Sequence, residues 1–208
     1  ESHEHLDLAA HEQWRMDRGE RNVVVEREDA ALDDLLYAPN DVVRAMPPEK
    51  RYALAGTELR DILTGQASSM GGLFVNDMRI RSWYERYARA DPIVLDGDPD
   101  LGLNASQLRA VAMMLRERVS LVQGPPGTGK TRTLVQTVSL LKQHFQVPHP
   151  ILLAAHTNVA VDNLAEGCVR AGLRVVRAGS STAARDSIIP HTYEAQCQRH
   201  ACYASLQE

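Results

Sequence analysis

Residues 124–131 read Gly-Pro-Pro-Gly-Thr-Gly-Lys-Thr. This stretch matches every fixed position of G-x-x-x-x-G-K-[ST], the pattern of loops that wrap phosphate groups. Its glycines permit backbone angles closed to other residues and let the chain approach an anion closely. Pro125 and Pro126 have no N–H group, so we expect them to stiffen the loop entry. The N–H groups expected to point inward as a positive cradle belong to Gly127, Thr128, Gly129 and Lys130.

Two side chains of the motif are candidates for catalysis. Lys130 would reach the β- and γ-phosphates of a nucleoside triphosphate, and the Thr131 hydroxyl would bind Mg²⁺. The candidate nucleotide-binding residues in this stretch are Gly124, Pro125, Pro126, Gly127, Thr128, Gly129, Lys130, Thr131 and Arg132.

The flanks of the loop favour this interpretation over a chance glycine-rich turn. Val119–Gln123 is a short apolar run that we interpret as a buried strand. Apolar residues then recur at helical spacing from Leu134 to Phe145. A strand, a loop and a helix in this order turn the helix N-terminus toward the phosphates.

The same alternation continues on both sides. Ser106 is a candidate cap for a preceding helix. Ile151–Ala155 and Leu173–Arg177 are further apolar runs, and a helix over roughly 160–171 separates them, ending before Gly172. This order predicts an α/β fold with a parallel sheet and right-handed crossovers. Ligands are then expected at the C-terminal ends of the strands.

The first hundred residues have a different pattern. The expected elements are a short strand at Val23–Val25 and helices at Ala30–Tyr37, Pro47–Leu63 and Val75–Ala88. We interpret the aromatic cluster of Trp83, Tyr84 and Tyr87 as helix packing, with base stacking as the alternative. Asp91–Leu103 holds two Pro and two Gly and reads as a linker. We therefore predict a mainly helical region over 1–95 and a phosphate-loop domain over 96–208.

Composition limits the partners. The 208 residues carry a net charge of −4, with a balance of −9 over 1–100 and +5 over 101–208, so the second half suits phosphate-bearing partners better. No run approaches the ~18 apolar residues of a membrane span, so no membrane partner is expected. Three cysteines without framework spacing predict a reducing compartment, cytoplasm or nucleus. Cys197, Cys202 and their histidine neighbours fit no standard zinc spacing.

Two stretches around the loop resemble a known family. Upstream is Leu103-Asn104-x-Ser106-Gln107-x-x-Ala110-Val111, and downstream is the run from Ile151 to Leu164 that contains Thr-Asn-x-Ala-Val-Asp. Together they resemble superfamily-1 helicases of the group that includes the nonsense-mediated-decay helicase. The resemblance implies a P-loop NTPase (RecA-like) first motor lobe that binds ATP with Mg²⁺. Weaker similarity ahead of residue 100 is to fungal helicases of this type, which suggests a fungal origin.

The resemblance also implies roles for single residues. Gln107 would contact adenine, since an amide both donates and accepts as the N6/N7 edge requires. The alternative is an ordinary polar residue on a helix surface. Thr157 and Asn158 would contact the backbone of single-stranded RNA or DNA, or they would simply cap a helix. Arg177 and Arg185 are either nucleic-acid contacts or solvated or salt-bridged side chains.

One expected feature is missing. No apolar run ending in Asp-Glu, which would hold Mg²⁺ and align water, follows Thr131. In the resembling helicases this pair comes later in the chain, so we expect an N-terminal fragment, as the absent initiator Met also suggests. The fragment alone is not expected to hydrolyse ATP well. The alternatives are a truncated nucleotide-binding or scaffold module without motor activity, and an AAA-type ATPase.

Overall fold

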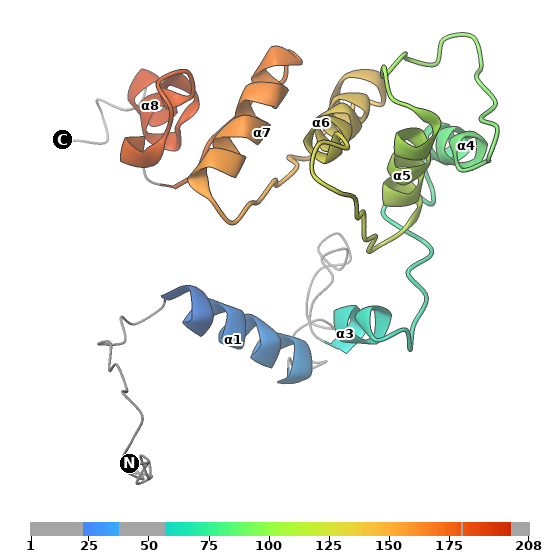
Figure 1. Ribbon diagram of the computed structural model, residues 1–208, viewed down its shortest axis with the longest axis horizontal. Coiled ribbons are helices and arrows are strands. Elements are labelled where there is room, and N and C mark those ends of the chain that lie inside the picture. The colour runs from blue at the N-terminus through green and yellow to red at the C-terminus, as the bar shows by residue number, and fades with distance from the viewer. Residues whose placement is uncertain (1–22, 38–56, 180, 201–208) are drawn as a thin grey trace, which may run out of the picture. The chain divides into compact units, whose positions relative to one another are not determined.

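The computed structural model of the chain describes residues 23–37, 57–179 and 181–200 (Figure 1). The contacts between residues group the chain into two compact units, 1–67 and 68–208, and each is described by itself. The α-helices are α1 (Val23–Tyr37), α3 (Thr57–Leu63), α4 (Met78–Tyr87), α5 (Ala105–Arg116), α6 (Lys130–Ser139), α7 (Asn158–Arg170) and α8 (Tyr193–Arg199). The shorter helices are a π-helix, η2 (Leu140–His144), and two 3₁₀ turns, η3 (Ser181–Ala183) and η4 (Ile189–His191).

In the first unit, α1 and α3 contact each other. Helix α1 includes Val23–Val25, so the predicted strand there is wrong, while the helix predicted over Ala30–Tyr37 is confirmed. Among the described residues no strand lies beside the three valines, and the Glu-, Ala- and Leu-rich sequence that follows favours helix. The predicted helix that ends at Leu63 is confirmed at that end, and its start at Pro47 lies outside the described residues.

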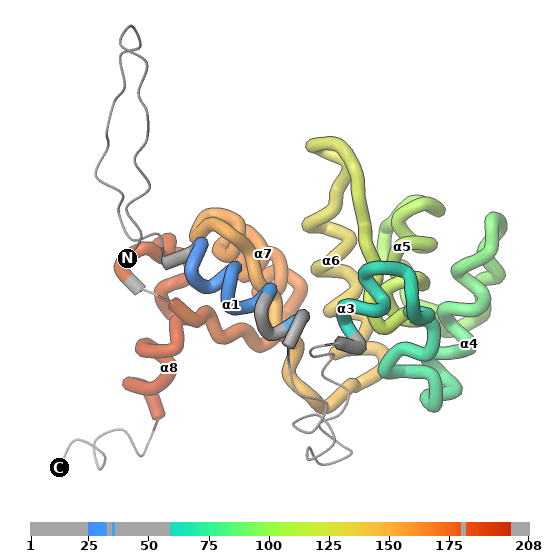
Figure 2. Tube along the Cα trace, turned by 90° about the horizontal axis from the view of Figure 1, so that it is seen from below, coloured from blue at the N-terminus to red at the C-terminus, as the bar shows by residue number. Residues whose placement is uncertain are grey.

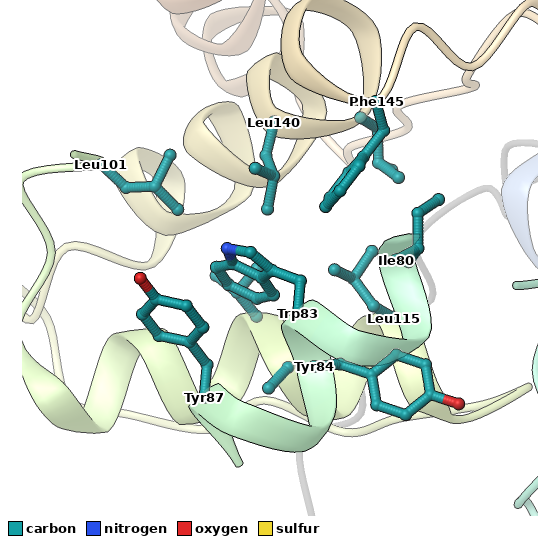
Figure 3. Close-up of a cluster of buried hydrophobic side chains, with 11 residues drawn as sticks. Ile80, Trp83, Tyr84, Tyr87, Leu101, Leu115, Leu140 and Phe145 are labelled. Carbon is teal, nitrogen blue, oxygen red and sulfur yellow. The ribbon is translucent and has the colours of Figure 1, made fainter. Parts of the chain in front are cut away.

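In the second unit, α4 packs on α5, α5 packs on α6, and α6 packs on α7. The Cα trace shows α5, α6 and α7 in this order (Figure 2). The main core lies where α4, α5 and the C-terminal half of the α6–η2 helix meet (Figure 3). Its fully buried side chains include Ile80, Trp83, Leu115 and Leu140.

The aromatic cluster belongs to this core. Trp83 and Tyr87 stack with ring centroids 4.2 Å apart, and Tyr84 is buried beside them. The interpretation of these residues as helix packing is therefore confirmed. Buried rings of this size dominate the energetics of a small core, so α4 is fixed firmly to α5.

The predicted linker folds back onto α4. Arg86 of α4 binds both carboxylate oxygens of Asp98, and the same carboxylate accepts from the Leu95 N–H at 2.8 Å. The hydrogen bond from Arg86 holds the pKa of Asp98 below its usual range. Leu101 then enters the core. Helix α4 thus groups with the second unit, and the division predicted between 1–95 and 96–208 stays a prediction.

The predicted parallel sheet is not confirmed in the described part of the chain. The three apolar runs at 119–123, 151–155 and 173–177 connect the helices as chain outside any strand, and their one bridge among the described residues joins Arg177 to Thr192. Side chains alternate along them, as in a strand with one covered face. Leu153 and Val175 pack against α6 and α7, while Leu121, Leu152 and Val176 are 86%, 90% and 60% exposed. A ladder needs a neighbouring strand, and these segments are not paired with one another.

Helix ends follow local capping chemistry. Helix α4 begins three residues later than predicted because the Asp77 carboxylate accepts from the N–H groups of its first turn. Asn104, and not Ser106, caps α5. Helix α7 begins at Asn158, two residues earlier than predicted, because Thr157 is its cap. Helix α6 continues into the π-helical turn η2.

Candidate nucleotide and nucleic-acid site

The phosphate loop closes tightly around its glycines. Gly127 and Gly129 both have φ of +79°, in the left-handed region, and Gly129 is the N-cap of α6. A Cβ atom on Gly124 would lie 2.8 Å from the Thr128 hydroxyl oxygen. The loop therefore needs glycine at these positions, for backbone angle at two of them and for space at the third. This is the close backbone approach that a phosphate cradle requires.

Lys130 lies across this loop. Its ammonium donates to the carbonyl oxygens of Gly124 at 2.6 Å and Pro125 at 2.9 Å. The Thr128 hydroxyl also donates to Pro125 O, at 2.8 Å. Lys130 is exposed, as is the loop from Pro125 to Thr128. The structure therefore places a positive charge at the open side of the loop, at the N-terminus of α6, where an anion is favoured.

The two residues after Lys130, Thr131 and Arg132, both line one groove. Thr131 is exposed and lines a groove of about 410 Å³ between α6 and α7, together with Asn163 and other residues of α7. Arg132 donates to the carbonyl oxygen of Gly102 at 2.8 Å. This bond joins the start of α6 to the end of the 91–103 segment. The predicted contact of Arg132 with nucleotide stays a prediction.

Gln107 reaches the loop from α5. Its oxygen accepts from the Asn104 N–H at 3.0 Å, which completes a capping box. Its NH2 group donates to Thr128 O at 3.0 Å and lies so close to Gly129 that a Cβ there would come within 2.8 Å. An amide has two donors and two acceptor sites, so one donor and one acceptor site remain beyond these bonds. Gln107 is thus beside the phosphate loop, with capacity for a base edge.

Thr157 and Asn158 stand together at the N-terminus of α7. The Thr157 oxygen accepts from the Ala160 N–H at 3.2 Å, so the capping role is present. Its O–H remains a donor. Asn158 is exposed, and its side-chain oxygen accepts from Arg177 at 2.9 Å. Within the described residues no hydrogen bond joins either residue to the phosphate loop, so the two candidate sites belong to separate loops.

Arg177 and Asp162 form an interior ion pair, and the sequence predicted neither this partner nor its burial. Arg177 is 2% exposed and Asp162 is 1% exposed, and Nε of Arg177 lies 3.3 Å from a carboxylate oxygen of Asp162. Of the two roles open for Arg177, the structure shows the salt bridge. Arg185 pairs with Glu166 at 3.3 Å, on the same face of α7. The available signal was an aspartate in the middle of a largely apolar helix, which needs a partner if buried.

The polar groups of the phosphate loop match the needs of a magnesium–nucleotide ligand. The glycine cradle, the Lys130 ammonium and the exposed Thr131 hydroxyl suit phosphate oxygens and a hard cation. Across the described ranges, no three His, Cys, Asp or Glu side chains gather as a metal-binding group. A cation at this loop would therefore take most of its ligands from phosphate and water. Within the same ranges, no helix is long and apolar enough to span a membrane.

Comparison with known proteins matches the second half of the chain. The model of the AAA domain family matches residues 102–207. The matched region begins two residues before Asn104, the cap of α5, and includes the phosphate loop and α7.

Three curated relatives share this region. ATP-dependent helicase upf1 of Schizosaccharomyces pombe is 48% identical over 84 residues, 38% of this chain and 9% of the relative. A regulator of nonsense transcripts 1 homolog of Arabidopsis thaliana is 49% identical over 75 residues, 36% of this chain and 6% of the relative. An uncharacterized ATP-dependent helicase of Methanocaldococcus jannaschii is 34% identical over 110 residues, 51% of this chain and 16% of the relative.

The chain therefore spans less than a fifth of the length of each of these relatives. They come from a fungus, a plant and an archaeon, so the suggested fungal origin stays a prediction. Nucleotide dependence is stated in the names of two of the three.

Proposed function

The chain belongs to the AAA domain family, within the superfamily-1 helicases similar to the nonsense-mediated-decay group, and from this premise we propose that it forms part of an ATP-dependent helicase motor. It would bind ATP through the phosphate loop and single-stranded RNA or DNA through the start of α7. The gene product would use ATP to move along a strand. The observation that carries this proposal is the glycine-closed loop with Lys130 at the N-terminus of α6.

In the proposed nucleotide site each residue has one task. The loop N–H groups hold the β- and γ-phosphates, and the Lys130 ammonium neutralises them. The Thr131 hydroxyl binds Mg²⁺, and Gln107 receives the adenine edge. When bound, ATP supplies a phosphoanhydride whose hydrolysis releases the energy for movement. Turnover needs an Asp-Glu pair and a second lobe, so this segment alone is expected to bind ATP without efficient hydrolysis.

We also propose that the three extended runs become strands of a parallel sheet in the complete lobe. Their alternating burial fits one covered face, and Leu121, Leu152 and Val176 are the large apolar side chains that a second layer would cover. The predicted limits of the lobe, 96–208, and a mainly helical region over 1–95, whose helix α4 packs on α5, remain part of this proposal. The proposed compartment is the cytoplasm or the nucleus.

The nucleic-acid contact is proposed at Thr157 and Asn158. Helix α7 has 13 residues, so its N-terminus offers free N–H groups and the positive end of the helix dipole. The Thr157 O–H and the Asn158 NH2 add donors of the kind that phosphate oxygens accept. Such contacts fix a backbone without reading its sequence. Binding is therefore expected to be sequence-tolerant and to weaken as salt rises.

The double variant Thr157→Ala with Asn158→Ala tests this contact. We expect single-strand affinity of the full-length gene product to fall by roughly tenfold at low salt, since two phosphate donors are lost. ATP affinity should be unchanged, because neither residue touches the loop. The measurement is fluorescence anisotropy with a labelled oligonucleotide, with thermal melting as the folding control. A folded variant with wild-type strand affinity would leave only the capping role for these residues.

Gln107→Ala tests the adenine contact. Losing a polar contact to a buried partner costs on the order of 1–3 kcal/mol, so the preference for ATP over GTP should narrow by that amount. Affinity for both nucleotides should also fall somewhat, because Thr128 O loses its donor. Calorimetry with ATP and GTP checks both effects, with the neighbouring Ser106→Ala as the matched control. An unchanged ATP-to-GTP ratio would limit Gln107 to supporting the loop.

The first alternative function is a nucleotide-binding or scaffold module without motor activity. The second is an AAA-type ATPase. ATP turnover distinguishes them. A motor should hydrolyse ATP faster when a single-stranded oligonucleotide is added, and Lys130→Ala should abolish that turnover. A scaffold module should bind ATP without turnover under either condition. An AAA-type ATPase should turn over ATP at a rate that the strand does not change.

A further inference from the structure

One face of α7 contacts the segment that follows this helix in the chain. Asn158, Asp162 and Glu166 are spaced four residues apart and so share this face. Asn158 and Asp162 both bind Arg177. Glu166 accepts from the Ser187 hydroxyl at 2.6 Å. Asn158 is the exposed residue at the start of this face. Asp162, in the next turn, is buried with Arg177.

Arg177 is held rigidly at its backbone as well as its side chain. Its N–H donates to His191 O at 2.7 Å, and its carbonyl accepts from the Tyr193 N–H at 3.0 Å. A Cβ on Gly179, where φ is +108°, would lie 3.2 Å from the guanidinium. The chain therefore passes close over the charged group and encloses it. Being 2% exposed, Arg177 cannot reach a nucleic-acid strand itself.

The hydrogen bond from Arg177 decides how the Asn158 amide is turned. A guanidinium only donates, so the amide must present its oxygen to Arg177. The NH2 group of Asn158, with two donors, is then left for another acceptor. A phosphate oxygen is an acceptor and cannot use an amide oxygen. The interior arginine thus selects the one amide orientation that suits a phosphate backbone.

We propose that Arg177 is a positioning residue for nucleic-acid binding: from the interior it holds the Asn158 amide with its oxygen inward and its NH2 group available to a strand phosphate. Asp162 fixes the guanidinium through Nε, and the Nη2 atom makes the bond to Asn158. The inference rests on the proposed strand contact at the start of α7. It adds that the contact depends on a side chain that never meets the strand.

Arg177→Lys is the discriminating variant. Lysine keeps a positive charge beside Asp162, so the fold is retained, but a single ammonium cannot reproduce the planar fork that serves Asp162 and Asn158 together. We expect affinity for labelled oligouridylate and oligothymidylate to fall about three- to tenfold, as in Asn158→Ala. ATP affinity should stay at the wild-type value. Ser187→Ala, which removes a bond on the same helix face, is the matched control and should bind the strand normally.

A double-variant cycle separates positioning from general damage. If Arg177 acts through Asn158, adding Arg177→Lys to Asn158→Ala should cause no further loss of strand affinity. Two independent, additive losses would overturn the inference, and so would wild-type affinity in Arg177→Lys. Wild-type affinity in Asn158→Ala would overturn the proposed contact itself. All arms use the full-length gene product, with melting temperatures measured for each variant.

Asn158→Asp is a second variant that keeps the bond to Arg177. Its carboxylate accepts from the guanidinium but has no N–H donors, so the fold is kept while the group offered to phosphate is removed. Strand affinity should fall at least as far as in Asn158→Ala. A wild-type affinity for either oligonucleotide would overturn the role assigned to the amide orientation.

Discussion

Lys130→Ala is expected to weaken ATP binding about a hundredfold while leaving AMP binding nearly unchanged. The ammonium lies across the loop at the N-terminus of α6, where the β- and γ-phosphates are proposed to bind. Charge-assisted hydrogen bonds to two phosphates account for a loss of this size, ~2.7 kcal/mol. AMP has neither phosphate and serves as the internal control.

Calorimetry with wild-type and variant protein gives both affinities directly. The conformation of the loop is expected to survive the substitution, because the Thr128 hydroxyl still donates to Pro125 O. Melting temperatures of the two proteins check this. Equal ATP affinity in the variant would contradict the assignment of residues 124–131 as a phosphate cradle. Equal losses for ATP and AMP would indicate a general collapse of the loop.

Trp83→Ala is expected to lower the free energy of unfolding by about 3–5 kcal/mol. The indole is fully buried, stacks on Tyr87, and joins α4 to α5 and to the η2 turn (Figure 3). Its removal leaves a cavity that close-packed neighbours cannot fill. Urea denaturation followed by circular dichroism measures the loss. Tyr193→Ala, at an aromatic that is 61% exposed, is the matched control and should change stability by less than about 0.5 kcal/mol.

Trp83→Phe refines this expectation. Among the described residues the indole N–H of Trp83 has no hydrogen-bond partner. Phenylalanine removes that buried donor along with part of the ring, so the two effects oppose each other. The expected loss is under about 1.5 kcal/mol. A loss as large as that of alanine would mean that the shape of the indole, and not its apolar area, holds α4 in place.

The phosphate loop and several helices could be predicted from the sequence, because they depend on residues close together in the chain. The phosphate loop depends on glycines and a lysine within eight residues, so its glycine angles and its place at the start of α6 follow from the motif. Helices α4, α5, α6 and α7 were also predicted, because their apolar spacing is local. Their ends shifted where capping was misread: Asn104 with Gln107 forms a capping box that the sequence already contained.

Features that depend on residues far apart in the sequence could not be predicted from it. Val23–Val25 has strand-forming side chains, but the described part of the chain holds no strand beside it, and the helical sequence that follows decides its conformation. The extended runs at 119–123 and 151–155 show the alternation of strands without the pairing, since pairing is set by other segments. The bond of Gln107 to Thr128 O joins positions 21 residues apart. Such contacts leave no periodic signal in the sequence.

The Arg177–Asp162 pair also constrains how this sequence can diverge. Replacing either residue alone leaves a charge in the interior without its counterpart, which typically costs about 3–5 kcal/mol. A lineage that loses one partner therefore carries a poorly folded intermediate until the other changes. Substitutions at these two positions should be inherited together, as charged pair or as apolar pair. A descendant in which both residues have become apolar no longer has the Arg177 donor that orients Asn158. Selection for strand binding should therefore remove such descendants first.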